Sequence, residues 1–252
     1  MLNIVVPMAG AGSRFVIAGY KDPKPLIPIK GFPMIQVVIE NLKPLCDHRF
    51  IFICQKSHVD KYELENKLNF WAPNSLIIGI DGVTEGAACT VLLAENLINN
   101  NEPLMIANSD QFIDVDINQY LETLSNNDYD GLIMTMKADD SKWSFIDYNE
   151  LGYISRVVEK EVISDEATVG IYNFRYGKDF VKAAQEMISK DLRVNNEFYV
   201  APVYNQLIES SKKIGFYNIG SENNGMYGLG TPSDLDNFLQ RPIVEKALVN
   251  LL

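Results

Sequence analysis

Apolar residues in the first half of the chain alternate between dense short runs and segments with helical spacing. Leu2–Met8 is a run typical of a strand that is buried on both faces. In residues 33–44, apolar positions recur every three or four residues, as on the buried side of a helix. Because short connections join such units, they predict a parallel sheet with helices on both faces. The predicted strands are 2–8, 50–54, 75–80 and 104–107, and the predicted helices are 33–44, 57–68, 87–98 and 116–126, the last with Asp116 as N-cap.

The pattern changes after about residue 130. Two apolar runs, 153–159 and 168–174, follow one another without room for a crossover helix, which predicts a mixed sheet in this half. No linker rich in Pro or Ser separates the halves, so we predict one α/β domain over 1–252, with lobes 1–130 and 131–252. Its central sheet should be mixed but mainly parallel. The other elements predicted here are strands at 131–136 and 214–218 and helices near 178–189 and 199–210 and from Ser233 and Pro242.

Composition and charge exclude several classes of protein. With 252 residues, 47% hydrophobic and 22% charged, the chain can bury a sizeable core and is not disordered. Its net charge of −11 argues against binding to the backbone of a nucleic acid. We find neither a signal peptide nor an apolar run long enough to span a membrane. The three cysteines cannot all pair with one another, so we expect reduced thiols and a cytoplasmic location, and the sequence leaves a homo-oligomer open.

A loop rich in glycine follows the first predicted strand. Gly10 and Gly12 permit tight turns and close approach of a ligand to backbone N–H groups, as phosphate binding requires. Phe15 stands where a dinucleotide-binding fingerprint needs a third glycine, and no P-loop lysine follows. Either the loop is a structural turn, or it binds a triphosphate with Arg14 as charge partner. A stiff segment with four prolines then carries Lys24, which can oppose the same polyphosphate from another side.

Several motifs, taken in order, resemble those of sugar-phosphate nucleotidyltransferases, a family with a Rossmann-like (GT-A-type) fold. The resemblance covers almost the whole chain. Two further segments, K-W-S-F (142–145) and 194–205, are similar to a branch that serves bacterial capsule and surface polysaccharides. The family motifs are A-G-A-G-S-R (9–14), P-K-P-L-I-P-I (23–29), T-E-G-A-A-C-T (84–90), N-S-D-Q (108–111), V-V-E-K (157–160), T-V-G-I-Y (168–172) and G-L-G-T-P-S-D-L (228–235).

The resemblance implies a division of labour among these residues. Catalytic roles fall to Arg14, Lys24 and Asp110, and Asp110 would also bind the metal. Nucleotide-binding roles fall to the residues of the glycine loop and of two later turns, namely Met8, Ala9, Gly10, Gly12, Ser13, Gly86, Ala87, Ala88 and Ser109. Roles in binding a phosphorylated acceptor fall to Glu159, Lys160, Gly170, Glu197 and Tyr199.

The chemistry of these residues suits nucleotidyl transfer. A phosphate monoester is largely dianionic near neutral pH, so it can attack the α-phosphorus of a nucleoside triphosphate without a general base. Catalysis then depends on positioning and charge neutralisation. Asp110 follows the predicted strand 104–107, where α/β sheets bind ligands, and its carboxylate suits Mg²⁺. The most specific expectation from the resemblance is transfer of CMP from CTP to phosphoglutamine, and the alternative is a uridylyl-, thymidylyl- or cytidylyltransferase that makes a nucleotide sugar.

Other interpretations stay open at this stage. A nucleotide-binding module without activity would keep the glycine loop but need not retain Lys24 or Asp110. A glycosyltransferase with an Asp-x-Asp motif would use Asp114 and Asp116. Two departures from the family pattern also matter. Gly228 stands where many relatives have a second metal-binding Asp, which leaves Asp234 as a conceivable substitute, and Glu161 replaces the proline that often follows the Glu-Lys pair.

Overall fold

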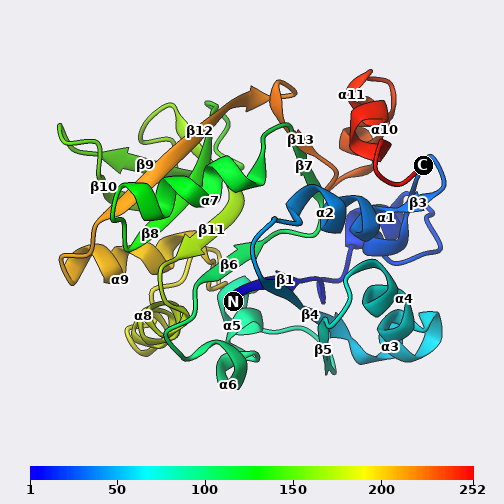
Figure 1. Ribbon diagram of the computed structural model, residues 1–252, viewed down its shortest axis with the longest axis horizontal. Coiled ribbons are helices and arrows are strands. Elements are labelled where there is room, and N and C mark those ends of the chain that lie inside the picture. The colour runs from blue at the N-terminus through cyan, green and yellow to red at the C-terminus, as the bar shows by residue number, and fades with distance from the viewer.

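The N-terminal apolar run forms strand β1, at the centre of the parallel part of a large sheet. The computed structural model describes residues 1–252, with helices on both faces of this sheet (Figure 1). The strands are β1 (Leu2–Pro7), β2 (Pro28–Ile29), β3 (Phe32–Pro33), β4 (His48–Gln55), β5 (Leu76–Ile80), β6 (Leu104–Ala107), β7 (Gln111–Ile113), β8 (Gly131–Lys137), β9 (Ser144–Tyr148), β10 (Ile154–Glu159), β11 (Glu166–Phe174), β12 (Ile214–Glu222) and β13 (Gly225–Gly228).

Most helices are short, and two single 3₁₀ turns occur. The α-helices are α1 (Ser13–Ile17), α2 (Met34–Leu42), α3 (Lys56–Tyr62), α4 (Leu64–Trp71), α5 (Ala87–Leu92), α6 (Glu95–Ile98), α7 (Ile117–Asn126), α8 (Gly177–Ser189), α9 (Tyr204–Glu209), α10 (Pro232–Leu239) and α11 (Ile243–Leu248). The 3₁₀ turns are η1 (Lys24–Leu26) and η2 (Ala201–Val203).

The eleven-stranded sheet has the order β5-β4-β1-β6-β11-β8-β12-β13-β7, and the β9–β10 hairpin attaches to β11. Strands β5, β4, β1 and β6 are parallel, whereas β11 runs antiparallel to both β6 and β8. The prediction of an α/β fold with a mixed sheet flanked by helices is therefore confirmed. Strand β7 follows β6 in sequence but pairs with β13 at the far edge, so Asp110 lies where the chain leaves the centre of the sheet.

The alternating side chains of the central strands pack into separate cores on the two faces of the sheet. In β1, Ile4 and Val6 join the core beneath α2, α4 and α7, while Val5 joins the core beneath α5, α8 and α9. A third core packs α1, α10 and α11 around Phe15 and Phe238. The period of two in the strands thus produces the layered arrangement, as the buried apolar runs predict.

The structure divides two of the predicted helices. The predicted helix at 57–68 breaks at Glu63, whose φ of 51° is left-handed. Helix α3 buries no residue, whereas α4 buries Leu64 and Leu68, so the turn at Glu63 brings the apolar side of α4 against the core. The predicted helix at 87–98 likewise splits into α5 and α6. The expected N-cap is confirmed, because the Asp116 side chain accepts a hydrogen bond from the Asn118 N–H.

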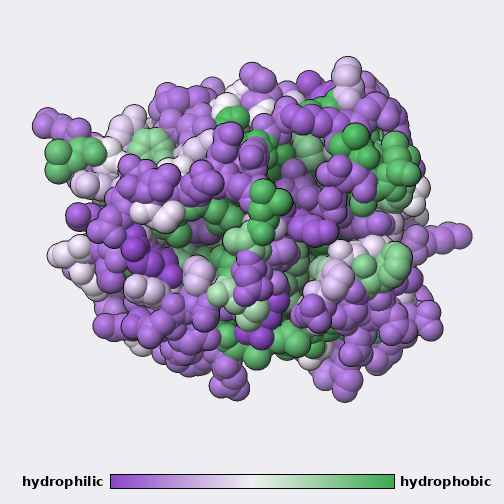
Figure 2. Space-filling view, in the orientation of Figure 1, coloured by the Kyte–Doolittle hydropathy of each residue, from purple (hydrophilic) through white to green (hydrophobic).

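The surface is mostly hydrophilic on the face drawn in Figure 2, as the charge content leads one to expect. No helix combines the length and apolar composition needed to cross a bilayer.

Candidate active site

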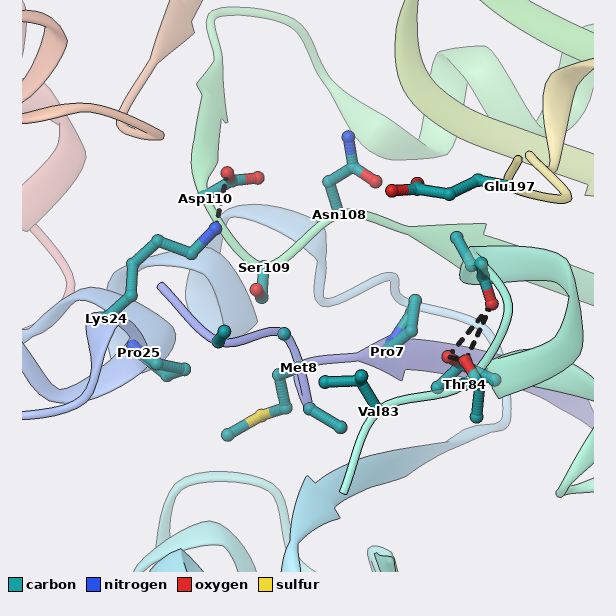
Figure 3. A pocket seen from close by; sticks show the side chains of 16 residues that line it. Pro7, Met8, Lys24, Pro25, Val83, Thr84, Asn108, Ser109, Asp110 and Glu197 are labelled. Atoms are coloured by element: carbon teal, nitrogen blue, oxygen red, sulfur yellow. Dashed lines mark hydrogen bonds and ion pairs between the residues drawn. The ribbon is translucent and has the colours of Figure 1, made fainter. Parts of the chain in front are cut away.

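A cavity of about 460 Å³ opens at the carboxyl ends of β1 and β6, where the glycine loop and the turn after β6 face each other (Figure 3). We call it the glycine-loop cavity. Loops at the carboxyl ends of parallel strands are the usual ligand site of such sheets. The lining residues are Pro7, Met8, Ala9, Gly10, Ala11, Lys24, Pro25, Val83, Thr84, Gly86, Ala87, Thr90, Asn108, Ser109, Asp110 and Glu197.

Lys24 and Asp110 form an ion pair in this cavity, although 86 positions separate them in sequence. Nζ of Lys24 lies 2.8 Å from Oδ2 of Asp110, and both side chains are about one quarter exposed (Figure 3). Pro23 and Pro25 fix the backbone on either side of Lys24 at the start of η1. The Asp110 carbonyl accepts from the Leu229 N–H, which holds the turn after β6 against the chain beyond β13.

Two glycines, Gly12 and Gly230, lie directly beside the Lys24–Asp110 ion pair. At Gly12, φ is +59°, and a Cβ would lie 3.4 Å from Cβ of Lys24. At Gly230, a Cβ would lie 2.8 Å from Oδ2 of Asp110. Each glycine therefore permits a close backbone approach to one member of the pair.

A second cavity, of about 300 Å³, adjoins the first. Ala87 and Asn108 line both cavities, so they form a shared boundary. Ligands in the two cavities could therefore both contact Ala87 and Asn108. The second cavity is lined by Ala87, Asn108, Lys142, Trp143, Ser144, Glu159, Lys160, Thr168, Val169, Gly170, Tyr172, Tyr199, Val200 and Ala201.

One buried carboxylate and one paired ammonium group lie side by side in the second cavity. Glu159 is only 8% exposed and accepts a hydrogen bond from the Ser144 hydroxyl. Burial raises the pKa of the Glu159 carboxyl, although the bond from Ser144 acts in the opposite direction. Nζ of Lys160 donates to the Tyr199 hydroxyl at 2.6 Å, and this bond raises the pKa of the Lys160 ammonium. Lys160 has a left-handed φ of 58°, an unusual conformation that sites of function often hold.

Glu159→Gln should stabilise the fold at neutral pH. Because its pKa is raised, the Glu159 carboxyl binds its proton more tightly in the folded protein than in the unfolded chain. The fold therefore loses stability as the pH rises through the native pKa and the buried carboxyl becomes charged. Glutamine keeps an acceptor for Ser144 without a charge. We expect a rise in Tm of about 2–4 °C at pH 7, equivalent to about 1 kcal/mol in a chain of this size. Thermal unfolding followed by circular dichroism should show the gain vanishing toward pH 4.5. An equal Tm at pH 7, or a gain that grows on acidification, would contradict this account.

Residues 194–199, here the bridging segment, connect the walls of both cavities. Glu197 lines the glycine-loop cavity and Tyr199 lines the second one. Between them, the Phe198 N–H donates to the Glu85 carbonyl at 2.8 Å, and the Ala88 N–H donates to the Phe198 carbonyl at 3.0 Å. The backbone of this segment is thus bonded directly to the start of α5.

The structure brings most of the predicted site residues to these two cavities. The glycine-loop cavity contains Met8, Ala9, Gly10, Lys24, Gly86, Ala87, Ser109, Asp110 and Glu197, and the second cavity contains Glu159, Lys160, Gly170 and Tyr199. Glu197 thus lies with the glycine loop rather than with the other predicted acceptor residues. Gly12, Ser13, Arg14 and Ala88 line neither cavity.

Arg14 and Ala88 differ from expectation for identifiable reasons. Of the expected group of Arg14, Lys24 and Asp110, the last two form the ion pair described above, and the Arg14 side chain is exposed on the short helix α1. Ala88 is fully buried, and its N–H is bonded to Phe198 rather than free for a base. At Gly86, a Cβ would lie 2.4 Å from the Phe198 carbonyl oxygen, so packing against the bridging segment already requires a glycine.

The sequence analysis includes Asn108, Lys142, Trp143 and Ser144 only as members of motifs and assigns no site role to any of them. Asn108 begins the N-S-D-Q motif, and a position after a buried strand was the signal that could have identified it. Lys142, at the mouth of the second cavity, pairs with Glu222 at 2.9 Å.

Asp110 provides a suitable ligand for Mg²⁺. Its Oδ2 atom bonds to Lys24, which leaves its other carboxylate oxygen for a hard cation. No cluster of three or more His, Cys, Asp or Glu side chains could hold a metal ion by itself. Mg²⁺ commonly uses one or two carboxylates together with water and substrate phosphates, so this donor set fits. At Gly228, a Cβ would lie 3.7 Å from Cγ of Asp234, so the Asp234 carboxyl lies beside the position at which the family resemblance implies a second metal ligand.

Comparison with known families agrees with this geometry. Residues 4–215 match the family model described as nucleotidyl transferase. The chain belongs to the nucleotidyl transferase family. The chain is 26% identical to the bifunctional protein GlmU of Methanococcus vannielii, in an alignment that covers 99% of the chain but 58% of that relative. The chain therefore spans a little over half the length of the curated relative.

Solved structures share the fold of this chain. A nucleoside-diphosphate-sugar pyrophosphorylase from Vibrio cholerae RC9 superposes with a TM-score of 0.80 at 24% identity, covering 94% of this chain and 100% of that one. The inositol-1-phosphate CTP transferase of T. maritima gives 0.70 at 14% identity, covering 98% and 96% of the two chains. At these identities the likeness concerns the fold alone.

Proposed function

We propose that the protein transfers a nucleotidyl group from a nucleoside triphosphate to the phosphate of a small acceptor and releases pyrophosphate. The observation that carries this proposal is the pair of adjoining cavities. One contains the glycine loop with Lys24 and Asp110, the other contains Lys160, and both are lined by Asn108. The first cavity is lined by residues before 111 together with Glu197, and the second mostly by residues after 141. This division supports a nucleotide-binding lobe 1–130 and an acceptor-binding lobe 131–252.

In the proposed reaction, an oxygen of the acceptor phosphate attacks the α-phosphorus. The new P–O bond forms as the bond to the β-phosphate breaks, and pyrophosphate leaves with the electron pair. Lys160 would hold the acceptor phosphate, and Lys24 would neutralise charge that builds on the departing phosphates. No side chain needs to accept a proton, because the attacking phosphate is already deprotonated.

We propose Asp110 as the protein ligand for Mg²⁺. When bound, the ion would supply charge neutralisation for the phosphates. Asp110 then has two partners, the cation and Lys24, and the chain fixes its carboxylate through the short turn between β6 and β7.

The acceptor and the base are the finer part of the proposal. The K-W-S-F segment of the second cavity supports phosphoglutamine with CTP, because this segment resembles the capsule branch of the family. The names of the relatives support a sugar 1-phosphate instead. A matrix of the four nucleoside triphosphates against phosphoglutamine, glucose 1-phosphate and N-acetylglucosamine 1-phosphate, with pyrophosphate release as readout, separates the two. If none of these phosphorylated acceptors supports pyrophosphate release, nucleotidyl transfer to a phosphorylated acceptor is refuted.

Lys160→Ala should weaken acceptor binding selectively. Removing the ammonium group leaves the acceptor phosphate without its cation, so we expect the acceptor KM to rise by about 10-fold or more while the nucleotide KM changes little. Steady-state kinetics with each substrate varied in turn measures both constants. Lys178→Ala is a matched control, since Lys178 also lies over a tyrosine ring but outside both cavities. Equal rises in the two KM values would count against the role given to Lys160.

A further inference from the structure

Asn108 is the polar side chain at the boundary between the two cavities. It follows β6 directly, is exposed, and lines both cavities together with Ala87. Figure 3 shows its amide in the upper part of the glycine-loop cavity, with the oxygen toward Glu197 and the nitrogen directed away from that carboxylate. A ligand that extends from one cavity into the other would therefore lie beside this side chain. The amide is neutral and carries two N–H donors, so it can donate hydrogen bonds to a phosphate oxygen without forming an ion pair with it.

The fold positions this amide through Gly170. Strand β11 shifts its register against β8 between Thr168 and Tyr172, and Gly170 lies inside the irregularity with φ of +81°. The Asn108 N–H donates to the Gly170 carbonyl at 3.0 Å. A Cβ on residue 170 would lie 2.1 Å from Nδ2 and 2.7 Å from Cγ of Asn108. The amide thus occupies space that any other residue at 170 would fill, and bulges of this kind commonly redirect side chains at active sites.

We propose that Asn108 is a catalytic residue whose side-chain N–H groups bind a non-bridging oxygen of the α-phosphate during transfer, with Gly170 as its positioning residue. This inference rests on the proposed function. It assigns the group that acts on the transferred phosphoryl itself, whereas Lys24 and Lys160 act on the phosphates at either side. A preorganised donor of this type acts mainly in the transition state, where charge on these oxygens changes.

The first test compares Asn108→Ala and Asn108→Asp with the wild-type protein. We expect Asn108→Ala to lower kcat by about 100-fold with both KM values within about threefold, and Asn108→Asp to lower it further, because it replaces donors by a negative charge. Asn126→Ala, at an exposed position on α7, controls for the substitution. A kcat for Asn108→Ala within about threefold of wild type, or an effect confined to the acceptor KM, would overturn the assignment.

The second test uses the two diastereomers of the α-thio nucleotide. Sulfur is a weak hydrogen-bond acceptor, so the diastereomer that places sulfur at the Asn108 amide should react more slowly in the wild type. In Asn108→Ala this preference between diastereomers should shrink, because the donor is gone. An unchanged preference would overturn the contact, and a merely structural role for Asn108 predicts that unchanged result.

The positioning role of Gly170 is tested by a double-mutant cycle. Gly170→Ala should lower kcat in the wild-type background but have little further effect in Asn108→Ala. If the kcat loss of the double variant equals the product of the two single losses, the positioning role of Gly170 is refuted. Should Gly170→Ala fail to fold, as judged by its Tm, the Asn108 and α-thio results alone decide the proposal. Failure of the proposed function looks different, since the wild-type protein would then release no pyrophosphate with any phosphorylated acceptor.

Discussion

Replacing Asp110 with asparagine is expected to remove nearly all pyrophosphate release, with a loss in kcat of about 10³-fold. Asparagine keeps the shape of the side chain and an oxygen for Lys24, but it loses the charge that a bound cation requires. Because the change is isosteric and the side chain is partly solvated, the Tm should stay close to that of the wild type. Single-turnover and steady-state measurements at saturating Mg²⁺ give the size of the loss.

Asp114→Asn is the matched control for this experiment. Asp114 forms the first position of the Asp-x-Asp pattern, yet it pairs with Lys246 and lines neither of the two cavities. We expect nearly wild-type turnover for this variant. Full pyrophosphate release by Asp110→Asn together with an inactive Asp114→Asn would refute the role given to Asp110 and move the active site to the Asp114–Asp116 turn.

Lys24→Ala should lower kcat by about 10²–10³-fold, the second largest effect expected. The substitution removes the ammonium group nearest Asp110, and with it the cation proposed to neutralise the leaving pyrophosphate. Stability should change little, since the ion pair is partly exposed to water and such pairs contribute at most about 1 kcal/mol.

Lys30→Ala is the matched control for Lys24→Ala. Lys30 also pairs with a carboxylate, Glu245, but on the exposed surface. Initial rates of pyrophosphate release for the two variants separate a role in the cavity from the general loss of a lysine. Since Lys24 and Asp110 contact each other, the double variant Lys24→Ala with Asp110→Asn should lose less activity than the product of the single effects. Equal losses for both lysine variants would contradict the assignment.

The sequence predicts the layers of the fold well because burial imposes its period on each element. Leu2–Pro7 and Leu104–Ala107 show their strand character as continuous apolar runs, and they lie as neighbours in the sheet. The break at Glu63 escaped prediction because the residues on both sides of it have acceptable helix propensity. Only packing against the core decides that α4 turns its apolar side inward. The short strands β7 and β13 pair with each other across more than a hundred positions, which no local pattern reveals.

The candidate site was predictable where a residue follows a buried strand or stiff loop, as Asp110 and Lys24 do. It was not predictable where a contact depends on a distant segment. The place of Asn108 after β6 is visible in the sequence, but the packing of its amide against Gly170 is not, nor is the bond from the Ala88 N–H to Phe198. The exposed orientation of the Arg14 side chain is likewise not visible in the sequence, because the direction of a side chain on a helix of five residues depends on how that helix packs.

The backbone bonds between Phe198 and the start of α5 have a consequence for re-engineering this protein. Enlarging the pocket for a bulkier base would displace the chain at Gly86, and Phe198 would have to follow because no side chain can absorb the shift between them. Tyr199, the neighbour of Phe198, is bonded to Lys160. Under the proposed function, this backbone link joins the base pocket to the acceptor pocket, so we expect directed evolution for a new base to change selectivity for the acceptor as well.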